Sequence, residues 1–193
     1  TVTAQLMSFK ITNAALPVLA LSLLLRVISK KAFLKNAAQA AAGFGFMLAG
    51  LEILNSSIPY LSESSLIFEA FKKYGSSPII GLIIGIITTM LVHSSSATVG
   101  LTIILFNSGF IDFHTALGLT LGDNIGTCVT AQLASIGTNI TARRVAWAHT
   151  FYNIIGVAAV LLLFQPFSDL VHFITYLTGG DKTNLVANSH TIF

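Results

Sequence analysis

The stretch MLVHSSSATVG, residues 90–100, decides the fold of this chain because it interrupts one of its most apolar tracts. Mostly apolar residues fill 78–91 and 99–106 on either side, yet four polar residues, HSSS, stand at 93–96. Residues 78–109 would form about 50 Å of continuous helix, whereas a bilayer core of about 30 Å needs only about 20 residues. We therefore predict two half-helices folded into a re-entrant hairpin with HSSS at its tip.

The composition is that of an integral membrane protein. The 193 residues are 54% hydrophobic and 9% charged, with a mean hydropathy of +0.82, whereas an average soluble domain has about 25% charged residues. The net charge is +3, and the basic residues stand in short groups between apolar tracts, as topology signals do. This pattern predicts a lipid bilayer as partner and argues against nucleic acid. The single cysteine, Cys128, excludes an internal disulfide.

Tract lengths predict an all-α chain with several membrane spans. A polar or interfacial connection is expected at 62–77. The predicted segments are spans 14–29 and 37–58, the hairpin 78–109, a span 116–137 interrupted by GDNIGT at 122–127, a span 142–164 and a C-terminal segment 168–193. Backbone without helical partners is tolerated at membrane depth only where it is buried in protein or lines a water-filled cavity. HSSS and GDNIGT are therefore the two places where a binding site is expected.

Two sequence echoes indicate a duplicated unit. TVTAQLMSFKITN at 1–13 recurs as CVTAQLASIGTN at 128–139, and AWAHTFYN at 146–153 recurs as ANSHTIF at 187–193. Such self-similarity is typical of repeat architectures. We therefore predict a fragment of a longer polypeptide, in which residues 1–13 are the tail of a first repeat and residues 14–193 are the second repeat.

The basic groups predict how the two repeats are related. If the hairpin enters and leaves by one face, the group Lys30, Lys31 and Lys35 falls on the same, cytoplasmic side as Arg143 and Arg144. An odd number of crossings then separates the two TAQL copies, so the repeats are inverted. Inverted repeats with broken helices meeting at the bilayer midplane are the architecture of many secondary transporters.

The polar residues of both motifs suit the binding of small ions. Serine hydroxyls accept toward a cation and donate toward an anion, and the N-terminus of a half-helix offers free N–H groups. Oxygen ligands also suit a hard cation such as sodium. The alternative is that the serines only hold helices together. Close helix packing is itself predicted by glycines that repeat every four residues, namely Gly81 and Gly85, and Gly118, Gly122 and Gly126.

Three segments, TTMLVHSSSATVG, GDNIGT with the following TAQ, and ARRVAWAHTFYN, resemble the second repeat of the type II sodium/phosphate cotransporter family. The resemblance implies an inverted-repeat secondary transporter with a re-entrant hairpin and broken transmembrane helices. It also implies sodium-coupled transport of inorganic phosphate across the plasma membrane by alternating access. Phosphate and sodium would bind between hairpins and broken helices of the two repeats, with no cofactor besides the coupling ion.

The resemblance implies a set of site residues, to which the residues themselves add His93, which can donate to phosphate, and Asp123, an acid in an interrupted membrane helix. The expected phosphate ligands are His93, Ser94, Ser95, Ser96, Asn124 and Thr127. The expected sodium ligands are Thr3, Gln5, Ser95, Ser96, Thr98, Asp123, Asn124, Thr130 and Gln132. Two of these depart from the family pattern, because the family usually has Gln at the position of His93 and a small residue at the position of Asp123. The alternatives are a His93 bonded to a nearby carbonyl and an Asp123 exposed in an aqueous vestibule.

Other functions stay open at this point. The same architecture could carry another anion or export phosphate, and a membrane sensor could bind the ions without moving them. An intramembrane serine hydrolase using Ser95 and His149 is a remote alternative, because the Gly-x-Ser-x-Gly elbow is absent. We expect the chain not to be an enzyme. We also expect no metal site other than sodium, because the histidines are scattered away from other ligand types. His149 is expected to have a structural role.

Overall fold

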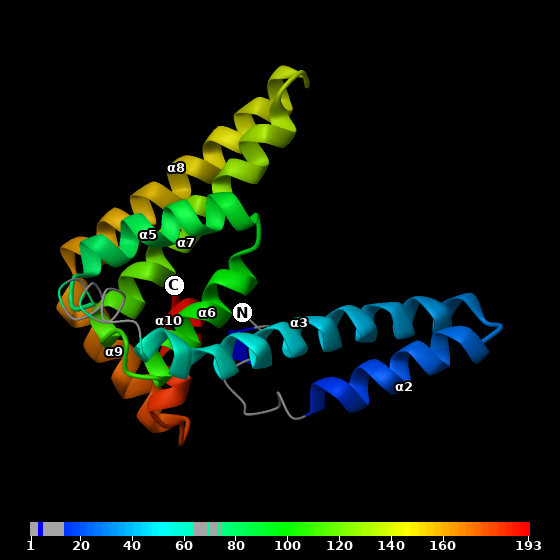
Figure 1. Cartoon of the computed structure of the whole chain (residues 1–193). Coiled ribbons are helices and arrows are strands. Elements are labelled where there is room, and N and C mark those ends of the chain that lie inside the picture. The colour runs from blue at the N-terminus through cyan, green and yellow to red at the C-terminus, as the bar shows by residue number, and fades with distance from the viewer. Residues whose placement is uncertain (1–3, 6–13, 64–68, 70–72, 74) are drawn as a thin grey trace.

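The computed structural model describes residues 4–5, 14–63, 69, 73 and 75–193, and this part of the chain is helical without β-strands (Figure 1). The predicted all-α class is confirmed. The elements are α2 (Ala15–Ile28), α3 (Ala32–Glu63), α5 (Pro78–Val92), α6 (Ser95–Asn107), α7 (Phe113–Ser135), α8 (Ile140–Leu162), α9 (Phe164–Leu177), the 3-10 turn η2 (Lys182–Asn184) and α10 (Leu185–Ile192).

The break predicted at the serine run is present. Helix α5 ends at Val92, and His93 follows it in the left-handed region, with φ 55° and ψ 27°. Ser94 is the N-cap of α6, because its hydroxyl accepts a hydrogen bond of 3.3 Å from the backbone N–H of Ala97. A left-handed residue followed by a serine cap ends one helix and begins the next within two residues. Its re-entrant position in a membrane stays a prediction.

The interruption predicted at GDNIGT is wrong. Helix α7 runs unbroken from Phe113 to Ser135 and includes the whole of 122–127. Its polar side chains bond backward to their own helix: the Thr127 hydroxyl donates to the carbonyl of Asp123, and the Asn124 amide donates to the carbonyl of Thr120. These local bonds are compatible with a continuous helix.

The glycines of this helix are explained by packing. A methyl group added at Gly118 would lie 2.1 Å from the carbonyl oxygen of Pro78, and one at Gly122 would lie 2.0 Å from that of Leu82. From the other side, a methyl group at Gly85 would lie 2.3 Å from the carbonyl oxygen of Leu119. Helices α5 and α7 therefore touch backbone to backbone, and the packing role predicted for the five glycines is confirmed.

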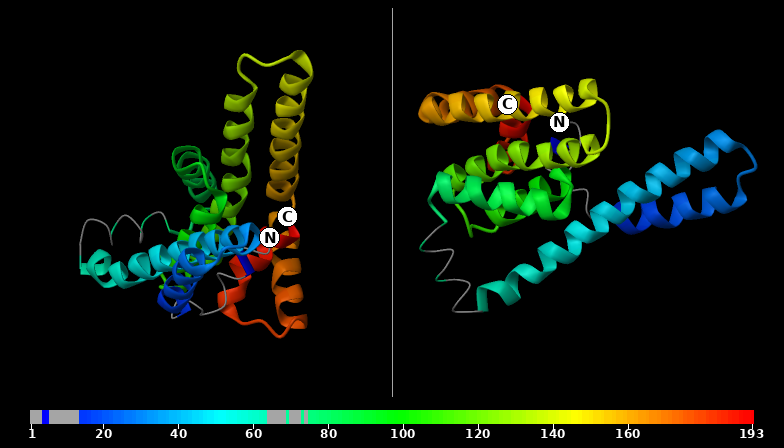
Figure 2. Two further views of the ribbon diagram at one scale, coloured as in Figure 1. Left: turned by 90° about the vertical axis from the view of Figure 1, so that its right-hand side faces the viewer. Right: turned by 90° about the horizontal axis from the view of Figure 1, so that it is seen from above.

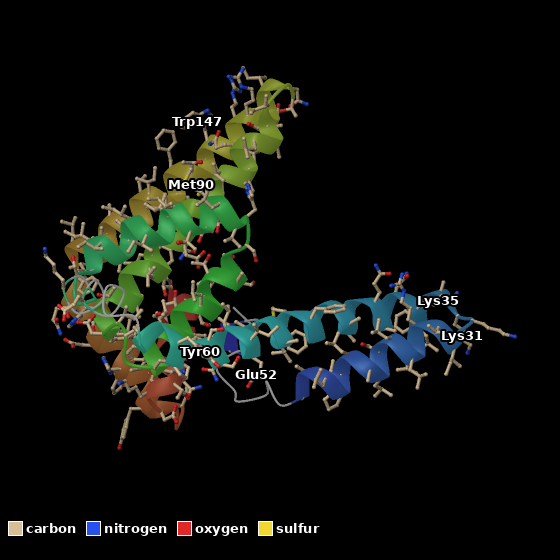
Figure 3. All side chains as sticks on the ribbon, in the orientation of Figure 1. Lys31, Lys35, Glu52, Tyr60, Met90 and Trp147 are labelled. Carbon is tan, nitrogen blue, oxygen red and sulfur yellow. The ribbon has the colours of Figure 1, made fainter. Side chains whose placement is uncertain are left out.

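Two arms extend from this pair of helices. Helices α2 and α3 make an antiparallel hairpin on one side, and α7 pairs with α8 to form the other arm (Figures 1 and 2). Helix α3 is longer than the predicted span 37–58, because it begins at Ala32 and continues through Pro59 to Glu63. Lys31 and Lys35 lie at the far end of the α2–α3 hairpin (Figure 3). Whether this end and the α7–α8 connection face the same side of a membrane stays a prediction.

The outer surface of the arms is apolar. Helix α3, over Ala32–Tyr60, and helix α8 are both long and apolar enough to cross a membrane by length and composition. Large apolar side chains stand exposed along α2, α3, α5 and α8, among them Leu16, Ile53, Ile83 and Ile155, and Trp147 points outward from α8 (Figure 3). Exposed apolar surface of this extent indicates contact with lipid or with further protein.

Candidate functional site

The tip between α5 and α6 presents polar groups at a helix N-terminus. His93 is exposed there, and Ser94, Ser95 and Ser96 are half-buried. Ser95 and Ser96 occupy the first positions of α6, whose N–H groups have no partner inside the helix. Within the described residues, the hydroxyls of Ser95 and Ser96 make no hydrogen bond. The tip therefore offers both donors and acceptors, and a positive helix end that favours anions.

A line of oxygen atoms leads from this tip into the interior. The Thr98 hydroxyl oxygen lies 3.3 Å from the carbonyl oxygen of Ser94 and 2.9 Å from the hydroxyl oxygen of Thr89. The Thr89 hydroxyl donates in turn to Oδ1 of Asp123, at 3.1 Å. Because a hydroxyl carries one proton, Thr89 donates to the carboxylate only while it accepts from Thr98. Helices α5, α6 and α7 each contribute one side chain to this line.

Asp123 is the end of the line and has 0% of its surface exposed. The alternative of an Asp123 exposed in a vestibule does not hold for this structure. His190 of α10 faces it, with Nε2 at 3.5 Å from Oδ2, a separation in the ion-pair range but too long for a good hydrogen bond. Within the described residues, Oδ2 of Asp123 and Nδ1 of His190 have no hydrogen-bond partner. Buried polar atoms without partners are rare in native structures.

The other predicted ligands on α7 do not join the serines. The hydroxyl of Thr130 donates to the carbonyl of Thr127, so both threonines bond within their own helix, as Asn124 does through its amide nitrogen. Among the described residues, no hydrogen bond connects Asn124 or Thr127 with Ser94–Ser96. Among the described residues, the carbonyl oxygen of the Asn124 side chain accepts none of these bonds. Thr3 lies outside the described residues.

The two TAQ glutamines make equivalent contacts. The amide of Gln132 donates to the Thr150 hydroxyl at 2.7 Å, and the amide of Gln5 donates to the Thr191 hydroxyl at 3.1 Å. Thr150 and Thr191 follow the histidines of AHT on α8 and SHT on α10, so each copy of the first echo bonds to one copy of the second. Gln5 also donates to the side-chain oxygen of Asn188 at 2.8 Å. The predicted sodium ligands Gln5 and Gln132 thus each donate a hydrogen bond to a threonine of another helix, α10 for Gln5 and α8 for Gln132. We call α8 and α10 the closing helices.

Gln132 also lines a cavity of about 590 Å³ at the end of the α7–α8 arm, together with Ser135, Thr138, Arg143 and Trp147. This cavity is separate from the tip residues that the sequence singles out. Gln132, near the C-terminal end of α7, and Asp123, near the middle of α7, therefore have different surroundings.

Asp123, Thr89, Thr98 and His190 form what we call the buried cluster. The sequence analysis did not predict two of these residues. Thr89 reads as one more small residue of an apolar helix, and His190 as one of several scattered histidines. The available signals were weak, since Thr89 lies one helical turn before the break and His190 belongs to the second echo. Among the described residues, no hydrogen bond joins Ser95 to His149, whose Nδ1 lies 3.5 Å from the side-chain nitrogen of Asn153.

Comparison with known proteins identifies a family that matches most of the chain. The family model described as Na+/Pi-cotransporter matches residues 1–56 and 64–179. No solved structure matches the chain.

Several curated proteins are similar to parts of the chain. The uncharacterized protein YqeW of Bacillus subtilis is 41% identical over 80 residues, covering 42% of this chain and 26% of that protein. The putative inorganic phosphate export protein YjbB of Escherichia coli is 28% identical over 154 residues, covering 78% and 27%. The sodium-dependent phosphate transport protein 2A of Ovis aries is 30% identical over 138 residues, covering 67% and 21%. The chain thus spans about a quarter of the length of these relatives.

Proposed function

Because the chain belongs to the Na+/Pi-cotransporter family, we propose that it forms part of a sodium-coupled carrier of inorganic phosphate in the plasma membrane. The observation that carries the proposal is the helix break at His93 and Ser94, which opens a helix N-terminus beside a line of oxygens that ends at Asp123. An anion and a cation can bind next to each other at such a place. The family is one of transporters, and the proposal includes no enzymatic step.

Phosphate binds at the tip in this proposal. The N–H groups of Ser95 and Ser96 and the hydroxyls of the serine run donate to its oxygens, and His93 adds a further donor. Asn124 and Thr127 complete the phosphate set after a rearrangement, since the Thr127 hydroxyl donates within α7 in the described state. Movement of one repeat against the other, as in alternating access, is a step that could bring α7 and the tip together.

Sodium supplies the charge that the transport needs. Moving a divalent phosphate into a cell at about −100 mV costs about 4.6 kcal/mol, since each charge contributes about 2.3 kcal/mol per 100 mV. At least two cations must therefore enter with it. The expected ligands on this chain are Ser95, Ser96, Thr98, Asp123, Asn124, Thr130, Gln132, Gln5 and Thr3. The complete protein, with its inverted first repeat, would supply the remaining half of the binding site.

The test is phosphate uptake by the complete protein in proteoliposomes with an inward sodium gradient. Ser95→Ala and Asn124→Ala are each expected to reduce sodium-dependent uptake at least about tenfold, because each removes a polar ligand of a desolvated ion. Ser56→Ala is the matched control, since the Ser56 hydroxyl is exposed and bonds only to its own helix at Ile53. Unchanged uptake in both site variants would refute this assignment of the ligands.

Export is the second candidate, because relatives that cover 78% of this chain are named putative inorganic phosphate export proteins. Right-side-out and inside-out vesicles of cells that produce the complete protein separate the two directions. Import predicts that sodium outside drives accumulation in right-side-out vesicles. Phosphate loss from preloaded right-side-out vesicles, without sodium-driven accumulation, would favour export instead.

A further inference from the structure

The end of the α7–α8 arm carries positive charge that the described residues do not neutralise. Arg143 and Arg144 stand near the start of α8, and both are exposed. Residues 124–168 contain no Asp or Glu, and among the described residues neither arginine makes an ion pair. This end of the arm projects away from the rest of the described chain (Figures 1 and 2). It therefore attracts anions from outside the chain.

A cavity of about 590 Å³ at this end combines one cation with apolar walls. Arg143 lines it and is the only ionisable side chain among the described residues that do so, whereas the neighbouring Arg144 does not line it. Leu133, Ile136 and Trp147 add apolar surface. The volume lies in the range of about 300–1,000 Å³ that is usual for small-molecule sites. The lining thus suits an anion with an apolar body.

The donors that remain in the lining are few. The hydroxyls of Ser135 and Thr138 donate to backbone carbonyls, and the amide of Gln132 donates to α8. Among the described lining side chains, the guanidinium of Arg143 and the indole N–H of Trp147 remain for a ligand. One guanidinium balances the single charge of a phosphodiester and can bind two of its oxygens side by side. Inorganic phosphate, which is close to a dianion at neutral pH, would keep an unbalanced charge.

The order of residues along α8 places this cavity at the level of lipid headgroups. Helix α8 is long and apolar enough to cross a membrane. Its arginines come first, and Trp147 and Phe151 follow about one and two turns later, with their ring centroids 5.6 Å apart. Trp147 points outward from the arm (Figure 3). Tryptophan is enriched where a membrane meets water, and basic pockets at that depth bind anionic headgroups.

We propose that this cavity binds the phosphodiester headgroup of an anionic phospholipid, such as phosphatidylglycerol, from the surrounding bilayer. The guanidinium of Arg143 pairs with the phosphate, while Leu133, Ile136 and Trp147 contact the glycerol and the first part of the acyl chains. The lining residues come from α7, from α8 and from the turn between them, so a bound lipid stabilises the end of the arm. The site is separate from the tip at Ser94, and the proposal does not depend on which ion the protein carries.

The experiment measures lipid selectivity at the cavity in the complete protein. A variant whose only cysteine replaces Thr141, an exposed residue two positions before Arg143, carries a bimane label. It is reconstituted in phosphatidylcholine vesicles that contain increasing fractions of phosphatidylglycerol with brominated acyl chains, which quench bimane on contact. Brominated phosphatidylcholine gives the reference, so the quenching curves yield the association constant of one lipid relative to the other. We expect phosphatidylglycerol to be preferred about fivefold, the effect of one partly screened ion pair.

Matched variants separate a specific site from general attraction to a basic surface. Arg143→Gln should remove the preference for phosphatidylglycerol. Arg144→Gln is the control, because Arg144 is adjacent, carries the same charge and is also exposed, but does not line the cavity. Its preference should stay within about twofold of that of the unsubstituted labelled protein. Arg143→Lys retains the charge without the guanidinium fork and should keep part of the preference, so that the loss in Arg143→Gln is not due to damage to the fold.

Three results overturn the proposal. One is equal quenching by brominated phosphatidylglycerol and brominated phosphatidylcholine when both arginines are present. The second is an equal loss of preference in Arg143→Gln and Arg144→Gln, which would indicate attraction to the surface charge of the arm and not a site. The third is recovery of the bimane fluorescence when an excess of inorganic phosphate is added, which would identify free phosphate as the occupant of the cavity.

Discussion

His93 combines a special backbone conformation with an exposed side chain at the tip between α5 and α6. It ends α5 with φ at 55°, in the left-handed region, while its side chain is exposed at the tip. A β-branched residue is strained there, whereas Asn adopts this conformation readily. We therefore expect His93→Val to lower the free energy of unfolding of the complete protein by about 1–2 kcal/mol, and His93→Asn to leave it nearly unchanged.

Thermal unfolding of the two variants checks this expectation, and phosphate uptake by His93→Asn then reports on the side chain alone. A stable Asn variant with a raised KM for phosphate would identify His93 as a ligand. Equal stability of the Val and Asn variants would contradict the role of the left-handed conformation.

Residues of the buried cluster mark the limit of what the sequence could predict. Asp123 was predicted as a sodium ligand because an acidic residue in an apolar helix is conspicuous. The structure places its side chain fully inside the protein. Thr89 and His190 were not predicted, since a threonine in an apolar helix and a lone histidine are common. Only the packing of α5 and α10 against α7 brings them to Asp123.

At the scale of elements, the contact between α5 and α7 depends on glycine. We expect Gly122→Ala to destabilise the complete protein by about 1–3 kcal/mol, the usual cost of overpacking, because its methyl group would lie 2.0 Å from the carbonyl oxygen of Leu82. Gly43→Ala in α3 is the control, since nothing lies within 4 Å of the added methyl group. There the change should stabilise by about 0.5–1 kcal/mol, the ordinary gain in a helix.

Thermal unfolding measures both variants under the same conditions. Equal midpoints for Gly122→Ala and Gly43→Ala would contradict the backbone contact.

The same glycines explain why one break was predicted correctly and the other was not. At HSSS the polar run begins a new helix through its serine cap, whereas at GDNIGT the glycines make room for a neighbouring helix and the polar side chains bond backward within α7.

At the scale of the molecule, the echoes predicted a duplication but not where its parts lie. The two closing helices differ in length and in distance along the chain from their glutamines, yet the bonds Gln5–Thr191 and Gln132–Thr150 are of the same kind. Helix α10 also bonds to Thr175 of α9 through Asn188 and faces Asp123 through His190. It therefore connects Gln5, in the first TAQL segment, to Asp123 on α7, which no local pattern could reveal.

This correspondence predicts selective cross-linking in the complete protein. With Cys128 replaced by Ala, cysteine pairs at Gln5 with Thr191 and at Gln132 with Thr150 should both react with a short bifunctional thiol reagent, because each pair is joined by a side-chain hydrogen bond. The exchanged pairs, Gln5 with Thr150 and Gln132 with Thr191, are the controls and should not react. If α8 and α10 are equivalent closing helices, both native pairs must react to a similar extent, as judged by mass spectrometry of the linked peptides. Reaction of the Gln132–Thr150 pair without reaction of the Gln5–Thr191 pair would mean that α10 contacts Gln5 in this piece of the chain but not in the complete protein.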